Sequence, residues 1–525
     1  MIYIALNPQP IFNMKNVIVF LKQLLLIGII LAAVSCKQTK NEQFPDPIIQ
    51  SGIAKLSGKL INYQPKKGEE IPTITLYVPN LITSESSTFE TSPKADGSFL
   101  FEVPVESNIT FGHIYSPVFN DHDVCVSLIP GKATKIEITF DKTGSVKANM
   151  IGGLALNSND LLNHGKMEGN FLDASEHDPF YKMTPLEFSH FAVDQLLPKR
   201  LKVAITDSTL SKRAKNFITN ECKLIFLNGC LLKYSGYISL NYHNFKAKGE
   251  PDDYTPQVPG KSYYALLKSF DLNDPQYLYS DTYGKVLQTL LSNETLNVPA
   301  IKDTPVKVWL TEVKKIMADL IGSDTGMFYD MLAINSYNRQ LNRALQPLSD
   351  KQKANIKSYF TNAEVTKILF KKNDEIVKLD VGKGFFKTVI NKTPAVTKDK
   401  LMKAIVSKYK GKAVLVDFWA TWCGPCMEAM KEVRKVKIEM QGKNIAFVYI
   451  TNVSSPVKLW NEDIISIGGE QYYLTAEEWE AVMDSFGFTG IPSYLFYDTK
   501  GVLKNKVTAY PGKEKMEKMI GELMM

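Results

Sequence analysis

The chain has 525 residues, too many for one hydrophobic core, and this length predicts about three or four folding units. Hydrophobic residues make up 44% and charged residues 22% of the sequence, proportions that are typical of ordered globular domains. Lys and Arg exceed Asp and Glu by 62 to 55, but the surplus is spread along the chain without a block of like charges, so we expect no nucleic-acid binding.

The chain begins with a predicted export signal. An uninterrupted apolar run extends from Leu24 to Val34, and Ser35 and Cys36 follow directly. A run of this length fits a secretory signal, because a membrane-spanning helix needs about 20 apolar residues. Small residues before a cysteine resemble a bacterial lipoprotein signal, which implies that Cys36 carries a lipid anchor. We therefore expect residues 1–36 to be a signal peptide; a plain secreted or uncleaved form is the alternative.

A tether and a β-rich domain are expected next. Residues 37–50 are polar and then proline-containing, which is typical of a linker. Residues 51–150 are predicted to form a β-sandwich, because "SFLFEVPV" alternates with a period of two and places apolar side chains from Phe99 to Val105 on one face. The segment "VCVSLIPGKATKIEITF" repeats the order strand, turn, strand. Such a domain is most often a spacer or a docking module.

Residues 151–390 are predicted to be mostly α-helical. The clearest segment is "TPVKVWLTEVKKIMADLIG", with Thr304 as N-cap, an apolar stripe from Trp309 to Leu320, and Gly322 as the stop. The region has no Gly-rich phosphate loop and no nucleophile elbow. We therefore expect no catalytic chemistry there.

No metal site is expected. The histidines show no metal-ligand spacing, and the acidic flanks of His122 in "NDHDV" indicate a loop. Cys222 and Cys230 are eight residues apart, about 12 Å along a helix, which is beyond the reach of a disulfide. We expect these two cysteines and Cys125 to be buried thiols. The six histidines are His113, His122, His164, His177, His190 and His243.

The pattern changes again in residues 391–525. A helix within "TKDKLMKAIVSKYKGK" precedes the apolar run Ala413 to Val416, which is expected to be a buried strand. Cys423 and Cys426 follow, and after them come an amphipathic helix and the strand "IAFVYI". The order strand, helix, strand predicts a sheet with a parallel core.

Cys423 and Cys426 are placed for thiol chemistry. Cys423 lies where the strand turns into a helix, so its sulfur faces unpaired N–H groups and the positive end of the helix dipole. Such surroundings lower the pKa of a thiol and make it a nucleophile near neutral pH. Zinc binding is the alternative for a Cys-x-x-Cys pair, but neither His nor Cys follows Cys426 to complete a ligand set.

Two motifs in this region resemble those of the thioredoxin fold. "VDFWATWCGPC" resembles the active-site strand and turn of that fold, and Gly490-Ile491-Pro492 resembles its cis-proline loop. Together with the export signal and the insert that follows "FVYITN", they make residues 391–525 similar to the envelope-facing TlpA-like disulfide reductases.

This resemblance implies a role for each matching residue. Cys423 corresponds to the attacking thiol and Cys426 to the resolving thiol. Pro492 corresponds to the cis-proline that keeps metal from the cysteines and lets the backbone of Ile491 pair with a substrate. Asp417 corresponds to the buried carboxylate that moves a proton to or from Cys426.

Three further positions complete the comparison with the family. Trp422 is expected to shape the substrate-facing surface, and Trp419 to lie in the core. The lysine that partners the buried carboxylate in thioredoxin has no counterpart in "FVYITN". Lys431 stands where relatives place a helix-kinking proline.

The expected function is a periplasm-facing, membrane-tethered thiol–disulfide reductase. It would use no cofactor beyond the Cys423–Cys426 disulfide, and its partners would be cysteine-containing envelope proteins and a membrane electron donor. Two alternatives stay open. One is an oxidant or isomerase of the same class, and the other is a non-enzymatic lipoprotein whose β and helical regions bind a partner while the thioredoxin fold is a relic.

Overall fold

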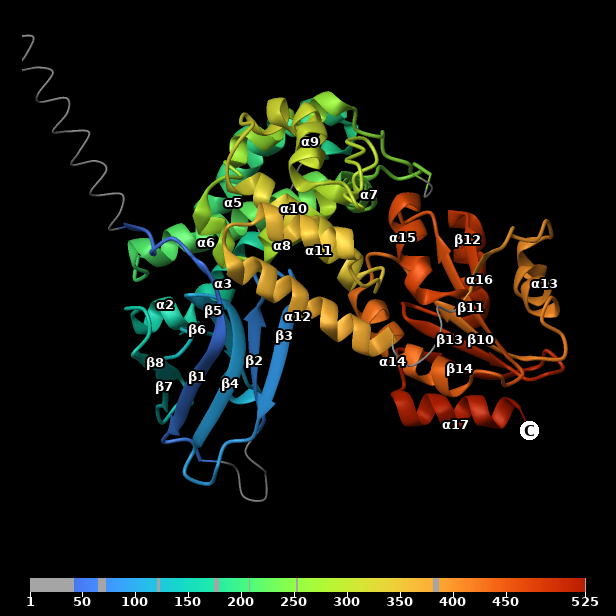
Figure 1. The fold of residues 1–525 in the computed structure, drawn as a ribbon, viewed down its shortest axis with the longest axis horizontal. Helices are drawn as coiled ribbons and strands as arrows, with labels where there is room; N and C mark the ends of the chain where they lie inside the picture. The colour runs from blue at the N-terminus through green and yellow to red at the C-terminus, as the bar shows by residue number, and fades with distance from the viewer. Residues whose placement is uncertain are drawn as a thin grey trace, which may run out of the picture.

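The computed structural model describes residues 42–64, 72–119, 123–173, 179–206, 208–251, 254–380 and 387–524. Two four-stranded sheets, a large helical part and a six-stranded sheet with its own helices follow one another along the chain (Figure 1). The predicted signal and Cys36 lie outside the described residues. Within those described ranges, no helix is both long and apolar enough to cross a membrane.

The first part consists of two sheets that share one hydrophobic core. Their strand orders are β4-β1-β7-β8 and β3-β2-β5-β6. In β4, Phe99, Phe101, Val103 and Val105 are buried at alternate positions, which confirms the predicted alternation. The bounds are β1 Ile49–Ile61, β2 Ile74–Pro79, β3 Ser86–Thr91, β4 Ser98–Ser107, β5 Thr110–Tyr115, η1 Pro117–Phe119, β6 Val124–Leu128, β7 Ala133–Phe140 and β8 Val146–Ile151.

The described part of the predicted tether packs against the body of the protein instead of extending from it. Phe44 is 4% exposed and lies among aromatic side chains of the first sheet pair and of the helical part, including Phe111 and Phe217. Gln276 Nε2 donates to Phe44 O at 3.0 Å, and the hydroxyl of Tyr279 donates to Pro45 O. An apolar side chain within a polar segment is the physical reason, because burying it stabilises the packed form.

The second part is helical throughout. Its elements are α2 Ser158–Leu162, α3 His164–Asp173, η2 Phe180–Lys182, α4 Pro185–Phe191, η3 Ala192–Leu196, α5 Leu197–Ala204, α6 Lys212–Phe226, η4 Leu227–Leu232, α7 Tyr234–Phe245, η5 Lys261–Phe270, η6 Pro275–Tyr279, α8 Asp281–Ser292, α9 Val306–Ile321, α10 Met327–Asn342, α11 Asp350–Tyr359 and α12 Ala363–Asp380. Cys125, Cys222 and Cys230 are buried free thiols, as predicted.

Helix α9 ends where the sequence predicts and begins one residue later. Gly322, with φ of 76°, closes the helix in the left-handed conformation that glycine favours. The N-cap residue is Pro305, not Thr304, because Pro305 has the extended backbone of a cap and its carbonyl accepts the Trp309 N–H. Thr304 belongs instead to a turn in which its N–H bonds Ile301 O at 3.0 Å.

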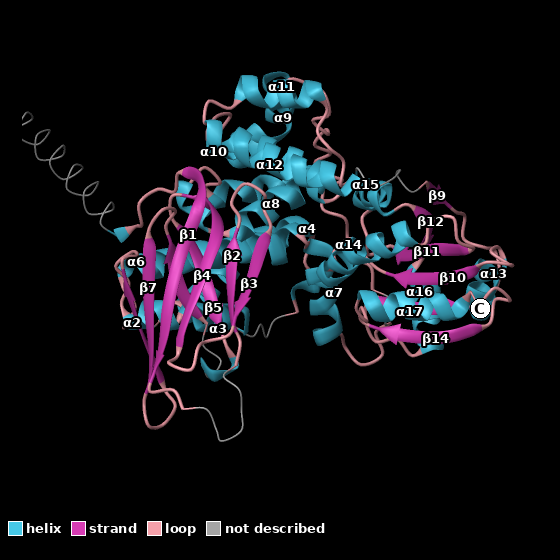
Figure 2. Ribbon diagram, turned by 60° about the horizontal axis from the view of Figure 1, so that its bottom comes forward, coloured by secondary structure: helices cyan, strands magenta, loops and turns pink. Residues whose placement is uncertain are grey.

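The third part is a six-stranded sheet with the order β14-β13-β10-β11-β12-β9. Strand β10 pairs in parallel with β11, and β11 with β12, which confirms the predicted parallel core. Figure 2 shows this sheet with helices on both sides. The bounds are β9 Thr388–Ile390, η7 Lys398–Lys400, α13 Leu401–Ser407, β10 Ala413–Phe418, α14 Gly424–Glu439, β11 Ile445–Asn452, α15 Val457–Ile467, β12 Gly469–Leu474, α16 Ala476–Phe486, β13 Ser493–Tyr497, β14 Leu503–Thr508 and α17 Lys513–Leu523.

Alternation along β10 assigns its side chains to two separate cores. Ala413 and Leu415 pack with side chains of α14 and α17, whereas Val414, Val416 and Phe418 pack with those of α13 and α16. All six residues of the strand are buried. The end of this central strand is therefore held rigidly, and the two cysteines follow it directly.

Candidate active site

Cys423 occupies the N-cap position of α14. The Cys426 N–H donates to Cys423 Sγ at 3.2 Å, and the two cysteines form a disulfide with their Cα atoms 5.3 Å apart. An N-cap sulfur receives both a backbone hydrogen bond and the positive end of the helix dipole. Both effects stabilise a thiolate on Cys423 once the disulfide is reduced.

The predicted proline loop lies against the first cysteine. The Ile491–Pro492 peptide is cis, and Cys423 Sγ lies 3.8 Å from Ile491 O. Cys423 is 4% exposed and Cys426 1%, so the disulfide is nearly covered. Two segments that are far apart in the sequence thus meet at one sulfur atom.

Asp417 is a buried acid on the face of the sheet that α14 covers. It is 1% exposed, and neither carboxyl oxygen has a hydrogen-bond partner among the described residues. Burial raises its pKa to about 8, and the positive charge of Lys437 opposes this rise. A carboxyl group with such a pKa can take up or release a proton near neutral pH.

Lys437 is the lysine that the sequence interpretation missed. It projects from α14, is 4% exposed, and its Nζ donates to Ile467 O at 2.7 Å and lies 5.0 Å from the ring centre of Tyr449. Tyr449 is the register partner of Asp417 in the β10–β11 pair. Burial lowers the pKa of Lys437 to about 7, with Arg434 adding to the effect and Asp417 opposing it.

A helical pattern could have identified Lys437. Met430 and Val433 are buried on α14 and Met440 is buried at its C-cap, and Lys437 occurs at the spacing that continues their stripe. A lysine within such a stripe faces the core. The partner of Asp417 was expected on the next strand, "FVYITN", whereas Lys437 lies on helix α14.

Trp422 and its neighbours form an exposed apolar rim beside Cys423. Trp422 is 60% exposed, and its Nε1 donates to Ser454 Oγ at 2.9 Å. Val453 and Val457, on either side of that serine, are 55% and 48% exposed. Trp419, by contrast, is fully buried, in agreement with its predicted place in the core.

The helical part holds the loop that precedes Trp422. Arg343 makes two bonds to Asp463 of α15, at 2.9 and 2.8 Å, and its Nη2 also donates to Thr421 O at 2.9 Å. From the other side, Ser455 Oγ accepts the Thr421 N–H at 3.0 Å. Nothing in the local sequence around Arg343 indicated this contact, because its partners come from a distant part of the chain.

The structure gathers most of the predicted site residues into one place. Cys423, Cys426 and Ile491 make direct contacts, and Asp417 and Trp422 lie on the strand and loop that lead to them. Lys431 forms an ion pair with Glu428 at 2.9 Å, and α14 is continuous through this position. Cys36 lies outside the described residues.

Comparisons with known proteins agree with this geometry. Residues 389–520 match the Redoxin family. The chain is 30% identical over 116 residues to the thiol-disulfide oxidoreductase ResA of Geobacillus kaustophilus, which is 22% of this chain and 64% of that protein. It is 29% identical over 121 residues to the thioredoxin-like protein YneN of Bacillus subtilis, which is 22% of this chain and 69% of YneN.

One solved structure among the matches is a thiol:disulfide interchange protein of the thioredoxin family from Chlorobium tepidum. It is 24% identical, with 22% of this chain and 83% of that chain covered and a TM-score of 0.21. The chain spans less than two thirds of the length of ResA from two Geobacillus species. Residues 389–520 thus match the Redoxin family, and this part of the chain is similar to proteins named thiol-disulfide oxidoreductases.

Proposed function

We propose that the protein is a thiol–disulfide oxidoreductase of the cell envelope that reduces protein disulfides with Cys423 and Cys426. The observation that carries this proposal is the position of Cys423 Sγ at the start of α14, where it accepts the Cys426 N–H and lies 3.8 Å from Ile491 O. This arrangement supplies a stabilised thiolate beside a backbone carbonyl with which a substrate segment can pair.

In the proposed reaction, the reduced protein gives two electrons to its substrate. The Cys423 thiolate attacks one sulfur of a substrate disulfide, so a mixed disulfide forms and one substrate thiolate leaves. Cys426 loses its proton and attacks Cys423 Sγ, which closes the Cys423–Cys426 disulfide and releases the second substrate thiolate. Both released thiolates take up protons, and a dithiol donor must reduce the protein again.

Asp417 is the proposed acceptor of the Cys426 proton. It lies on the sheet face that α14 covers, and its oxygens have no hydrogen-bond partner among the residues that the structure describes. A buried carboxylate accepts a proton readily, because neutralisation removes the cost of its burial. The positive charge of Lys437 keeps part of the Asp417 population ionised for this task.

Reduction is the proposed direction. The Gly-Pro pair between the cysteines matches that of thioredoxin, whose potential is about −270 mV, against about −120 mV for a dedicated oxidant. A redox titration against glutathione tests this direction. A value above about −180 mV, the level of a disulfide isomerase, would favour the oxidant or isomerase alternative.

The proposed location is the periplasmic side of a membrane, with lipid on Cys36. The support is the apolar run before Cys36 and the small residues next to it. The proposed partners are envelope proteins with exposed disulfides and a membrane dithiol donor, because an oxidising compartment does not keep Cys423 and Cys426 reduced.

Trapping of the mixed disulfide tests the proposed function. Cys426→Ser removes the resolving attack and leaves Cys423 at its helix start, so substrates should stay attached to Cys423. We expect the variant, purified from native envelopes without reductant, to carry a small set of adducts that dithiothreitol releases. The double variant Cys423→Ser, Cys426→Ser should carry none.

Cys230→Ser is the matched control, because it removes a buried thiol far from the disulfide and should trap nothing. Wild-type protein should also reduce insulin in the presence of dithiothreitol. Absence of both the adducts and insulin reduction would overturn the enzymatic proposal and favour the partner-binding alternative.

A further inference from the structure

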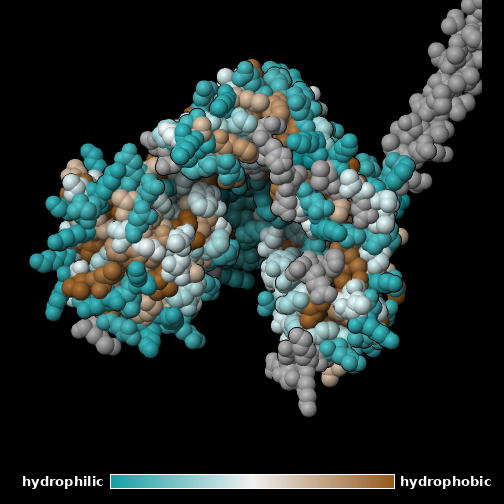
Figure 3. Space-filling view, turned by 180° about the vertical axis from the view of Figure 1, so that it is seen from behind, coloured by the Kyte–Doolittle hydropathy of each residue, from teal (hydrophilic) through white to brown (hydrophobic). Residues whose placement is uncertain are grey.

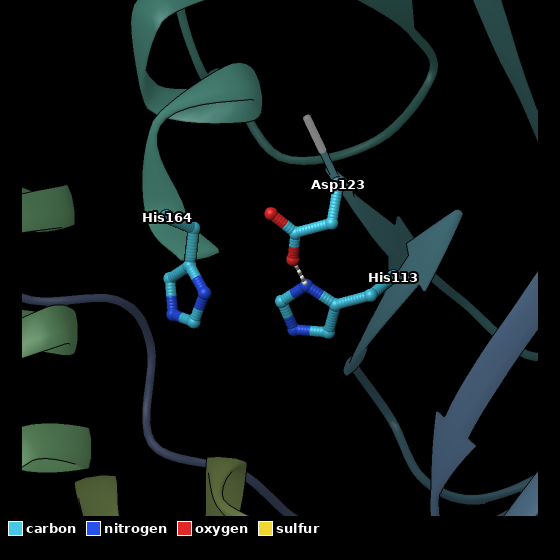
Figure 4. A group of neighbouring side chains, drawn as sticks. All are labelled: His113, Asp123 and His164. Carbon is cyan, nitrogen blue, oxygen red and sulfur yellow. Dashed lines mark hydrogen bonds and ion pairs between the residues drawn. The ribbon is translucent and has the colours of Figure 1, made fainter. Parts of the chain in front are cut away.

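Two histidines and an aspartate meet where the first sheet pair contacts α3. His113 lies on β5, Asp123 directly before β6, and His164 at the first position of α3. Figure 4 shows the three side chains turned toward one another, and their nearest ligand atoms all lie within 4.8 Å. Local ligand spacing in the sequence predicts no metal site here, because these residues come from three separate segments.

His164 is a buried side chain without a hydrogen bond. It is 3% exposed, and neither ring nitrogen has a partner among the described residues. The nearest carboxylate, Glu168 Oε1, lies 3.6 Å from Nε2, which is too far for a good hydrogen bond. Leaving a buried polar group unpaired is unfavourable, so a ligand that satisfies this ring would stabilise the fold.

Asp123 is held in place for a ligand. Its Oδ1 accepts the Gly165 N–H at 3.1 Å, and its Oδ2 lies 2.8 Å from His113 Nδ1. A Cβ at position 165 would lie 2.3 Å from Asp123 Oδ1, so any side chain there would displace the carboxylate from its present place. The backbone of α3 thus approaches the carboxylate closely and presents His164 beside it.

The surroundings favour a cation. Glu168 Oε1 lies 3.6 Å from His164 Nε2, and Glu221 is a further buried acid on α6, the helix that packs against α3. A positive ion would compensate this group of buried acids.

We propose that His113, Asp123 and His164 bind a divalent transition-metal cation of the Zn²⁺ type, which fastens the sheets to the helical part. Two imidazoles and one carboxylate are a ligand set that such cations prefer. Bonds of about 2.0–2.2 Å place tetrahedral ligand atoms roughly 3.4 Å apart. Ligand atoms that now lie up to 4.8 Å apart would therefore approach one another, and the 2.8 Å hydrogen bond between His113 and Asp123 would open to admit the ion. Glu168 Oε1, 3.6 Å from His164 Nε2, would have to move closer to act as the outer carboxylate that orients a metal-bound histidine.

Metal titration of the full chain in its oxidised form tests the site, because the Cys423–Cys426 disulfide then offers no thiolate. Protein treated with a chelator should bind one equivalent of Zn²⁺ by calorimetry. Co²⁺ should produce the visible absorption of a nitrogen and oxygen site without thiolate ligands. Zn²⁺ should also raise the thermal midpoint, since a ligand that binds only the folded state stabilises it.

Variants and a matched control assign the binding to these residues. Asp123→Asn and His164→Gln should each weaken Zn²⁺ binding by at least about tenfold. His243→Gln, which changes an exposed histidine on α7, should bind as the wild type does. The Co²⁺ spectrum of the wild type serves as a readout even if a variant fails to fold.

Two results would overturn the proposal. One is oxidised wild-type protein that binds no Zn²⁺ near one equivalent and shows no thermal shift. The other is folded variants that bind as tightly as the wild type. Either result would make the cluster an ion pair between His113 and Asp123 with His164 packed against it.

Discussion

Asp417 and Lys437 are an acid and a base that share one buried environment. Burial raises the pKa of Asp417 to about 8 and lowers that of Lys437 to about 7, so each favours its neutral form near neutral pH. From about pH 4 to pH 8, folded Asp417 keeps a proton that the unfolded chain has lost. Its contribution therefore lowers the free energy of unfolding as the pH rises through this window.

At higher pH, the titration of Lys437 changes the free energy of unfolding in the opposite direction. Above about pH 7, its folded form has lost a proton that the unfolded chain keeps until about pH 10. The unfolded state then binds more protons, so the free energy of unfolding rises with pH in that window. The contributions of the two residues therefore add up to a minimum in the free energy of unfolding between about pH 7 and pH 8.

Asp417→Asn should stabilise the oxidised protein at neutral pH. Asparagine cannot ionise, so the variant avoids the cost of burying a charge, and we expect a gain above about 1.4 kcal/mol, the value of one pKa unit. Urea denaturation at pH 5 and pH 7.5 measures this, with the larger gain at pH 7.5. Asp484→Asn, at an exposed position, is the control and should change little at either pH.

The same substitution should slow thiol exchange. Without a proton acceptor, Cys426 forms its thiolate less readily, and general-base losses are typically about 10²-fold. Single-turnover reduction of a disulfide substrate at pH 7 measures the rate of release from the mixed disulfide. If the rate is unaltered while stability rises, Asp417 is only a structural acid.

At the scale of elements, α14 unites the parts of the site. Its N-terminus stabilises the Cys423 sulfur, its first turn carries Cys426, and its buried face carries Lys437. Val433 and Val436 fix the helix on the same core that contains Leu415 of β10. One rigid unit of strand β10 and helix α14 thus fixes the position of the attacking sulfur relative to the buried acid and base.

Helix α9 provides an element-scale test of the fold. Gly322→Ala should destabilise the helical part by about 1 kcal/mol, because φ of 76° is unfavourable for a residue with a Cβ. Gly169→Ala is the matched control: it lies within α3, nothing lies near its added Cβ, and alanine is the better helix former. Calorimetry should show opposite shifts of the thermal midpoint, and equal shifts would contradict the assigned end of α9.

At the scale of the whole molecule, the helical part contacts the third part, which contains the six-stranded sheet, through charged side chains. Arg343 binds Asp463 and the Thr421 carbonyl, and Arg339 binds Glu462 on the same helix, α15. Elsewhere the molecule is hollowed between the C-terminal sheet and the first sheet pair, as Figure 3 shows. The site is thus fastened at the loop before Trp422.

Arg343→Ala should weaken both stability and exchange. It leaves the fully buried Asp463 without its partner, a loss of about 3–5 kcal/mol for a buried pair, and releases Thr421 O. The double variant Arg343→Ala, Asp463→Ala should regain most of the stability but not the exchange rate. A double-mutant cycle on thermal midpoints measures this, and simple additivity would mean that the pair contributes no coupling.

Cys36→Ala should release the protein from membranes. The prediction depends on the sequence around Cys36 alone, because this residue lies outside the described residues. Cell fractionation and the mass of the mature chain provide the measurement, with Cys125→Ala as control. An unchanged membrane fraction and no lipid mass on the wild type would contradict the anchor.

The sequence by itself determined the features that depend on local pattern. Alternation predicted the buried face of β4, the glycine at position 322 predicted the end of α9, and the two motifs around Cys423 and Pro492 predicted a cysteine pair at a helix start and a cis-proline loop. These predictions succeed because period, capping and turn preferences act over a few residues, so a short segment contains the information.

Only the tertiary structure decided which distant residues act together. Lys437 reaches the surroundings of Asp417 from another element, Arg343 reaches Thr421 from the helical part, and His113 meets His164 across two regions. In each contact, the packing of whole elements brings the two residues together, and local patterns in a single sequence do not predict that packing. The burial that this packing imposes is what shifts the pKa values of Asp417 and Lys437 and leaves the ring of His164 without a hydrogen bond.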